Sequence, residues 1–332
     1  MTGLGSRGSH WVDQLLKRDD VEIVAYVEPA AQIAEQAIEQ FNLDRSGVFD
    51  SLDDAVSSVS ADFVCDVTPP GVHHVIAQKA FDNGLHLLQE KPLSNDFSVA
   101  QQTVAAGRAA GMRHMITQNY RFHPCPRTTR RVLDEGLIGQ VGQVDLRWYM
   151  NWADIPGSFY VTAPYMLIND MMVHHFDMMR YVLNADPVTV HAITWNHPWS
   201  WLKGNSAHVI VFEYPDGMRA THVSLGATVG KRTTYWGDWS INGSRGSITW
   251  ELDRMWHSHL HRTDEPVNRE ILPDDVPDQS VAIVDEFFCA IDENRDPECC
   301  AADNLKSLAM VFGAIKSTVE ERRVSLDEHI NL

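Results

Sequence analysis

The stretch TGLGSRGSHW, from Thr2 to Trp11, decides the fold prediction. Gly3, Gly5 and Gly8 give the spacing G-x-G-x-x-G, and apolar residues at helical spacing continue to Leu16. Such a turn needs glycines because the backbone bends tightly there and approaches a pyrophosphate, which binds among the free N–H groups of the helix N-terminus. The spacing alone is weak evidence, so the prediction depends on the sequence around it.

Short apolar runs and helical patterns alternate through the first part of the chain. We expect strands at residues 21–27, 62–67, 85–88 and 112–117, with helices at 29–41, 72–83 and 98–110 between them. This alternation predicts a parallel, doubly wound sheet. A strand should also precede Gly3, yet only Met1 and Thr2 do so, and we therefore expect a truncated first strand and an internal methionine at position 1.

The pattern changes near Pro124 and Pro126, which we take as the boundary between a domain of residues 1–123 and a domain of residues 124–332. Strands with alternating apolar residues are expected at 144–152, 187–195, 207–214, 219–225, 239–242 and 247–252, and helices at about 169–183, 281–294 and 304–321. The predicted fold class is an α/β Rossmann domain followed by an α+β domain, whose mostly antiparallel, open-faced sheet has helices on one face.

Composition limits the possible partners. The formal net charge of -18 argues against nucleic acid and anionic membrane surfaces, because both would repel the chain. No apolar run approaches the ~20 residues of a membrane span. The five cysteines have no C-x-x-C spacing and are expected to be free thiols in a reducing compartment, so we expect a soluble, cytoplasmic protein.

Glu28 ends the second predicted strand, about twenty residues beyond the glycine turn. Its carboxylate could accept hydrogen bonds from the hydroxyl groups of an adenosine ribose. No Arg or Lys follows it within EPAAQIAEQ, so nothing there would neutralise a 2′-phosphate. The sequence therefore predicts NAD as the cofactor and makes NADP less favourable.

Four further motifs complete a family pattern. After Gly3–Gly8 come Thr68-Pro69-Pro70 with His73, then Glu90-Lys91-Pro92, then NYRFHP at 119–124, and INGSRGSITW at 241–250. In order and spacing the chain resembles the Gfo/Idh/MocA oxidoreductases, the glucose-fructose oxidoreductase and inositol dehydrogenase relatives. The resemblance implies a homodimer or homotetramer and cofactor contacts from Gly3, Gly5, Ser6, Arg7, Gly8, Glu28, Thr68, Pro69, His73, Glu90 and Lys91.

QEKPLS, from Gln89 to Ser94, places a lysine directly after an apolar run. A lysine at the carboxyl end of a parallel strand lies where open α/β sheets bind ligands. The resemblance implies the same position for Lys91, beside the nicotinamide and the reacting hydroxyl, with Pro92 fixing the bend.

The helical stretch NDMMVHHFDMMRYVL places Asp170, His174 and Asp177 on one face, at i, i+4 and i+7. We expect His174 to be the general base, oriented by Asp170, because its free pKa lies near neutral pH. His175 points away and should be structural. The stretch is similar to the family's D-x-G-x-H-x-x-D helix, although Met172 replaces the glycine. These residues form no zinc spacing, so we expect no metal.

The substrate is predicted to be a sugar, inositol or related polyol, oxidised at a carbinol carbon. The substrate candidates are Lys91, Asn119, Tyr120, Arg121, Trp152, Asp154, Tyr165, Asp170 and His174. Two alternatives remain open: an NAD-dependent glycosidase, which oxidises transiently and uses Asp154 or Tyr165 as the acid, and a non-catalytic dinucleotide-binding regulator. The apolar strands 191–195 and 209–212 also predict a sheet-to-sheet homodimer.

Overall fold

The computed structural model describes residues 1–152, 159–259 and 267–330. The chain divides into two units, one of Met1–Gln118 with Gln279–Leu305 and one of Asn119–Asp278 with Lys306–Leu332. The predicted boundary between residues 123 and 124 lies near the observed one. The difference is the segment 279–305, which belongs to the first unit although it follows the whole second sheet.

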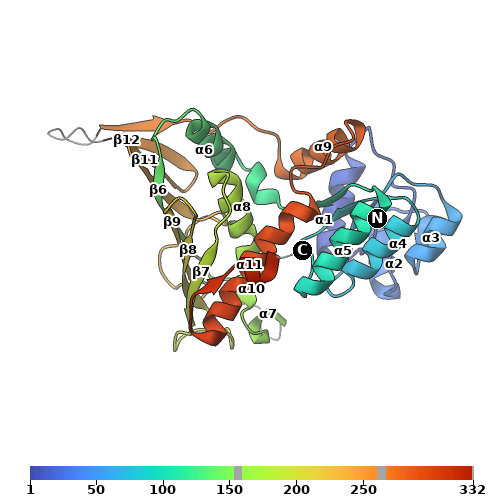
Figure 1. Cartoon of the computed structure of the whole chain (residues 1–332). Coiled ribbons are helices and arrows are strands. Elements are labelled where there is room, and N and C mark those ends of the chain that lie inside the picture. The colour runs from blue at the N-terminus through green and yellow to red at the C-terminus, as the bar shows by residue number, and fades with distance from the viewer. Residues whose placement is uncertain (153–158, 260–266, 331–332) are drawn as a thin grey trace. The chain divides into compact units, whose positions relative to one another are not determined.

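Short parallel strands alternate in the first unit with helices, which are labelled in Figure 1. β1 (Tyr26–Val27) pairs with β2 (Val48–Phe49), and β4 (His86–Gln89) lies between β3 (Phe63–Asp66) and β5 (His114–Ile116). The helices are α1 (Ser6–Leu16), α2 (Ala31–Phe41), α3 (Leu52–Ser58), α4 (His73–Asp82), α5 (Phe97–Ala110) and α9 (Gln279–Asp292). The helices predicted at 29–41, 72–83 and 98–110 are confirmed, whereas β2 and α3 were not predicted.

Thr2 occupies the position of a central strand. It forms parallel bridges to Val27 and to Asp66, and so stands between β1 and β3. The order of neighbours is therefore β2, β1, Thr2, β3, β4, β5, as in a doubly wound sheet. Residues 21–25, predicted as strand, form none; together with Met1 they line a hollow of about 1080 Å³. The strand predicted at 21–27 is confirmed only at its end.

The second unit is built on a nine-stranded sheet of order β13-β12-β11-β10-β6-β9-β8-β7-β14. All neighbours are antiparallel except β6 and β9. The strands are β6 (Val141–Tyr149), β7 (Thr189–Trp195), β8 (Ala207–Glu213), β9 (Arg219–Leu225), β10 (Asp238–Gly243), β11 (Gly246–Glu251), β12 (Arg254–His259), β13 (Val267–Ile271) and β14 (Val324–Ser325). The mostly antiparallel sheet predicted from the alternating pattern is confirmed.

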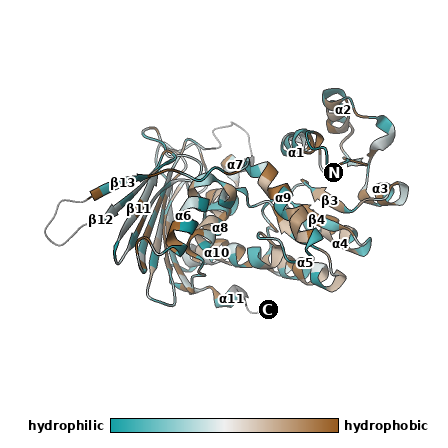
Figure 2. Cartoon of the chain, turned by 90° about the horizontal axis from the view of Figure 1, so that it is seen from above, coloured by the Kyte–Doolittle hydropathy of each residue, from teal (hydrophilic) through white to brown (hydrophobic). Residues whose placement is uncertain are grey.

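Helices cover one face of this sheet (Figures 1 and 2). They are α6 (Pro124–Asp134), α8 (Val173–Leu183) and α10 (Ala301–Glu320), with η2 (Asn119–Phe122), α7 (Phe159–Thr162), η3 (Leu167–Met172) and α11 (Asp327–Ile330) as shorter elements. Alternate residues of β8 explain the arrangement, because Ile210 and Phe212 are fully buried against the helices while Val209 and Val211 are half-buried on the other face.

Two general expectations can be compared with the structure. All five cysteines are free thiols, as predicted. Among the described residues no helix is both long enough and apolar enough to cross a lipid bilayer.

Candidate active site

The glycine turn leads into α1 in the first unit. Gly3 has a φ of 82°, and a Cβ there would lie 2.7 Å from the Val67 carbonyl oxygen; a Cβ on Gly8 would lie 2.1 Å from the Gly3 carbonyl oxygen. Gly5 differs, since its Cβ would meet no atom of the described residues within 4 Å. It is the N-cap of α1, and no side chain caps this helix end or places an acid in its first turn. The turn thus offers an open backbone approach suited to a pyrophosphate.

Glu28 follows β1 directly and is buried. Its carboxylate accepts hydrogen bonds from the Leu4 N–H, at 2.9 Å, and from the Ala30 N–H, at 3.0 Å. The side chain therefore holds the glycine turn against the end of β1. A carboxylate has about four acceptor positions, so two remain for ribose hydroxyl groups.

Glu90 and Lys91 follow β4, as the sequence predicted. The buried Glu90 carboxylate accepts hydrogen bonds from Arg7 Nε, at 2.6 Å, and Trp11 Nε1, at 2.8 Å, and also from the Lys91 N–H, at 3.1 Å. Glu90 thus ties α1 to the end of β4. Lys91 is half-buried, and its peptide bond to Pro92 is cis.

His73 joins the turns after β3 and β4. Its ring is fully buried, with Nε2 2.7 Å from the Thr68 carbonyl oxygen and Nδ1 3.0 Å from the Pro92 carbonyl oxygen. Thr68 is held in turn by Asp66, whose Oδ1 accepts from its hydroxyl group at 2.7 Å. Direct contact of His73 with a cofactor stays a prediction, because the ring nitrogens already have protein partners. Pro69 lies in the same turn.

Asp170 and His174 lie at the junction of η3 and α8 in the second unit. η3 is a π-helical turn, a local widening that is often found at functional sites. The His174 ring stacks on Tyr120, with centroids 4.3 Å apart and planes 13° from parallel. Met172, which replaces the family's glycine, is fully buried in the hydrophobic core. Its side chain therefore packs inward.

Tyr160 is a site residue that the sequence did not single out. The Asp170 carboxylate raises the pKa of the Tyr160 hydroxyl group, and burial adds to this effect. The Tyr160 ring also meets Trp152 edge-on, with centroids 5.5 Å apart. Trp152 and Asp170, both predicted substrate residues, are thus linked through Tyr160. Its short helix has no periodic pattern that could have revealed it.

The other substrate candidates have different surroundings. Arg121 is buried and donates to both carboxylate oxygens of Asp177, at 2.7 and 2.6 Å. Its guanidinium group therefore forms a buried ion pair with Asp177, and a substrate contact from Arg121 stays a prediction. Tyr165 has a φ of 50° in the turn before η3, and its carbonyl oxygen accepts the N–H of Ile168. Asn119 is half-buried, and Asp154 lies outside the described residues.

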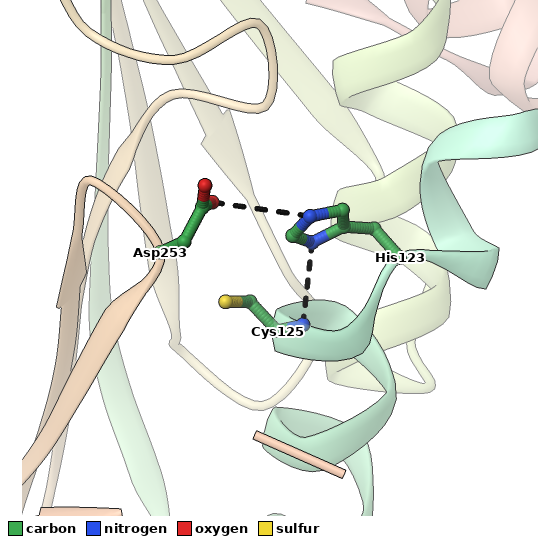
Figure 3. Close-up of side chains that lie close together, drawn as sticks. All are labelled: His123, Cys125 and Asp253. Carbon is green, nitrogen blue, oxygen red and sulfur yellow. Dashed lines mark hydrogen bonds and ion pairs between the residues drawn. The ribbon is translucent and has the colours of Figure 1, made fainter. Parts of the chain in front are cut away.

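A histidine, a thiol and a carboxylate also approach one another in this unit (Figure 3). His123 Nδ1 accepts the Cys125 N–H at 3.3 Å, so a neutral ring carries its proton on Nε2, which lies 3.9 Å from Asp253 Oδ1. A metal on Nε2 would move that proton to Nδ1, against the Cys125 N–H. The trio therefore fits a helix cap with a nearby carboxylate better than a metal centre.

Both units match family models. Residues 1–118 match "Oxidoreductase family, NAD-binding Rossmann fold", and residues 127–249 match "GFO/IDH/MocA C-terminal domain". An inositol 2-dehydrogenase from Rhizobium meliloti is 22% identical over 82% of this chain and 82% of its own. A D-apiose dehydrogenase from Paraburkholderia graminis is 23% identical over 93% of this chain and 84% of its own.

A solved structure shows the same fold. An oxidoreductase from Agrobacterium radiobacter, in complex with NAD+, L-tartaric acid and magnesium, superimposes with a TM-score of 0.88 over 98% of this chain and 97% of its own, at 19% identity.

Proposed function

The chain belongs to the Gfo/Idh/MocA family of NAD-binding oxidoreductases, and from this premise we propose that it transfers a hydride between nicotinamide and a carbinol carbon of a sugar, inositol or related polyol. The observation that carries the cofactor half of the proposal is the open space at Gly5, at the uncapped start of α1. The substrate class is inferred from the relatives, because two of them are named for inositol and for apiose.

The residues of the first unit fit a bound dinucleotide. The Gly3–Gly8 turn and the α1 N-terminus, with Ser6 and Arg7, would hold the pyrophosphate. Glu28 would accept hydrogen bonds from the adenosine ribose, which supports NAD over NADP because a 2′-phosphate would meet its carboxylate. Thr68, Pro69 and Lys91 complete the proposed contacts. When bound, the nicotinamide accepts or supplies the hydride.

The residues of the second unit are proposed to accept and transfer the proton. Oxidation of a carbinol leaves a proton on the substrate oxygen, and His174 is the proposed base. Its stacking on Tyr120 fixes the plane of the ring, so that a ring nitrogen is presented in one orientation. The Asp170 carboxylate would stabilise the charged ring. In the first unit, Lys91 is proposed to hold the substrate oxygen. Trp152, Tyr160 and Tyr165 are proposed substrate contacts.

The test is NADH formation by the purified protein on a panel of cyclic polyols and aldoses, with NAD and with NADP. His174→Asn and Lys91→Ala should each lower kcat/KM by about 10²- to 10⁴-fold, because each removes a group that handles the proton or its oxygen. Lys17→Ala, at the exposed C-cap residue of α1, is the matched control and should leave the rate unchanged.

Each result bears on a separate part of the proposal. Undiminished activity of the His174 variant would remove its assignment as base. A tenfold or larger preference for NAD is expected, and equal use of NADP would remove the role of Glu28. Release of sugar from an aryl glycoside without net NADH would instead identify the glycosidase reaction.

A further inference from the structure

Three buried histidines form a continuous hydrogen-bonded chain beneath the proposed base. His175 lies in α8, His222 in β9 and His208 in β8. His175 Nδ1 is 2.8 Å from His222 Nε2, and His222 Nδ1 is 2.9 Å from His208 Nε2. At its other nitrogen, His175 Nε2 is 2.7 Å from the Tyr235 carbonyl oxygen. His175, predicted from the sequence to be structural, has both ring nitrogens in hydrogen bonds within the protein, and no local sequence pattern indicates these partners.

The tautomers of this chain follow from its anchored end. A carbonyl oxygen only accepts, so His175 Nε2 must carry a proton and donate it to Tyr235. In a neutral ring His175 Nδ1 is then an acceptor, and His222 Nε2 must donate to it. By the same step His208 Nε2 donates to His222 Nδ1. All three rings therefore have one defined tautomer, with the proton on Nε2.

The chain connects to the ring of His174 through aromatic contacts. The residue after Tyr235 is Trp236, whose ring meets Tyr120 edge-on at 5.8 Å between centroids. Tyr120 is also the ring on which His174 stacks, and it contacts His175 at 6.0 Å. His174 is thus held in two ways. Its neighbour His175 is hydrogen-bonded to the sheet through His222. Its stacking partner Tyr120 packs on Trp236, which follows the residue that accepts the other His175 hydrogen bond.

We infer that His222 is a positioning residue for the proposed base, acting through His175 and Tyr235 to fix the first turn of α8 and the stacked ring of His174. This inference rests on the proposed function. His222 itself is fully buried, so it is placed to act through its two histidine partners. An ordinary apolar residue would fill the same space, but it would leave the His175 and His208 groups without partners.

Two substitutions at His222 separate positioning from packing. His222→Gln can keep a donor and an acceptor at positions similar to the two ring nitrogens, whereas His222→Leu fills the space and provides neither. We expect His222→Leu to lower kcat at least tenfold with little change in the KM for NAD, and His222→Gln to recover kcat to within about threefold of the parent enzyme. Equal activity of the two variants would overturn the inference.

The control is Val144→Ala in β6, at a fully buried position outside the histidine chain. It should lower the melting temperature but leave kcat unchanged, which distinguishes general destabilisation from loss of positioning. A loss of kcat in this control equal to that of His222→Leu would also overturn the inference.

A second measurement does not depend on activity. Nitrogen NMR of the histidine rings should show His175, His222 and His208 as neutral Nε2–H tautomers near neutral pH, and His222→Leu should alter the resonances of the other two. If no polyol is oxidised but these resonances are seen, the proposed function is wrong and the hydrogen-bonded histidine chain is confirmed. If His222 carries its proton on Nδ1, the hydrogen-bonded histidine chain is wrong, and the inference about His222 is overturned whatever the activity.

Discussion

Three glycines of one turn have different physical reasons to be glycine. Gly8 is fixed by sterics, because a Cβ would collide with the Gly3 carbonyl oxygen, while Gly5 has an ordinary φ of -61° and open space around it. We predict that Gly5→Ala raises the Kd for NAD at least tenfold, because the added methyl group occupies the approach of the pyrophosphate, and leaves the melting temperature within about two degrees of the parent. Calorimetric titration with NAD and a thermal melt measure both quantities.

Gly47→Ala is the matched control, since a Cβ there also has no neighbour within 4 Å in the part of the chain that the structure describes. It should change neither quantity, whereas Gly8→Ala should lower the melting temperature. Unchanged affinity in Gly5→Ala would show that no ligand approaches this backbone.

For single residues, the sequence indicated which residue types belong to the site better than it indicated which side chains they contact. The sequence predicted the glycine turn, Glu28 and Lys91 as site residues, because each lies at the end of a strand that can be recognised from neighbouring residues alone. Arg121 was predicted to contact the substrate, and that contact stays a prediction. Its buried pairing with Asp177 joins residues that are distant in sequence, and no local pattern indicates which of many carboxylates an arginine meets.

Between elements, the histidine chain makes the second sheet sensitive to acid. Burial lowers the pKa of His175 to about 4 and that of His208 to about 3, and it lowers the pKa of His222 well below its usual value. The folded state therefore binds fewer protons than the unfolded state. Above the pKa of about 6.5 that these histidines have in the unfolded state, they cost the folded state nothing. As the pH falls from there toward their pKa values in the folded state, the free energy of unfolding decreases.

We predict that His208→Gln reduces the acid sensitivity of folding. Removing one such group should lessen the fall in the free energy of unfolding by up to about 1.4 kcal/mol per pH unit below pH 6.5. Urea titrations of parent and variant between about pH 7 and pH 5 measure this difference. His191→Gln, at an exposed position of β7, should keep the slope of the parent. Parallel slopes for parent and His208→Gln would show that His208 is not held neutral.

Elements with a clear period were predicted from the sequence, and those set by tertiary contacts were not. α4, α5, α8 and the strands β6 to β11 follow their apolar patterns. By contrast, residues 21–25 carry a strand pattern but form no strand, because a strand requires a paired neighbour. The π-helical turn at Leu167–Met172 was read as ordinary helix, since its widening is not encoded in the spacing of apolar residues.

For the whole molecule, the predicted two-part organisation and the observed units differ mainly at residues 279–305. This segment follows the second sheet in the sequence and yet packs with the first unit, where Ile116 N–H donates to the Cys299 carbonyl oxygen at 2.9 Å. Such a return of the chain depends on contacts far apart in sequence, and helical periodicity alone cannot show which core a helix joins.

The open face of the second sheet carries the last prediction. Ile193, Val209 and Val223 are neighbours across β7, β8 and β9, and they form an apolar row on the face opposite α6, α8 and α10. Ile193 is 59% exposed and the nearby Trp195 is 38% exposed. An apolar patch of this kind favours burial against a second copy, related by twofold symmetry, so we expect a homodimer through this face.

Ile193→Glu should convert that dimer to a monomer, because a carboxylate from each subunit would be buried in the contact without a partner. The exposed position makes the substitution harmless to an isolated chain. Light scattering at micromolar concentration should give about twice the 37.5 kDa of one chain for the parent, and a mass near 37.5 kDa for the variant. Val319→Glu, at a position of α10 that is 62% exposed, is the control and should remain dimeric. A parent protein with the mass of a single chain would refute the sheet-to-sheet contact and leave the exposed row of β7 without an explanation.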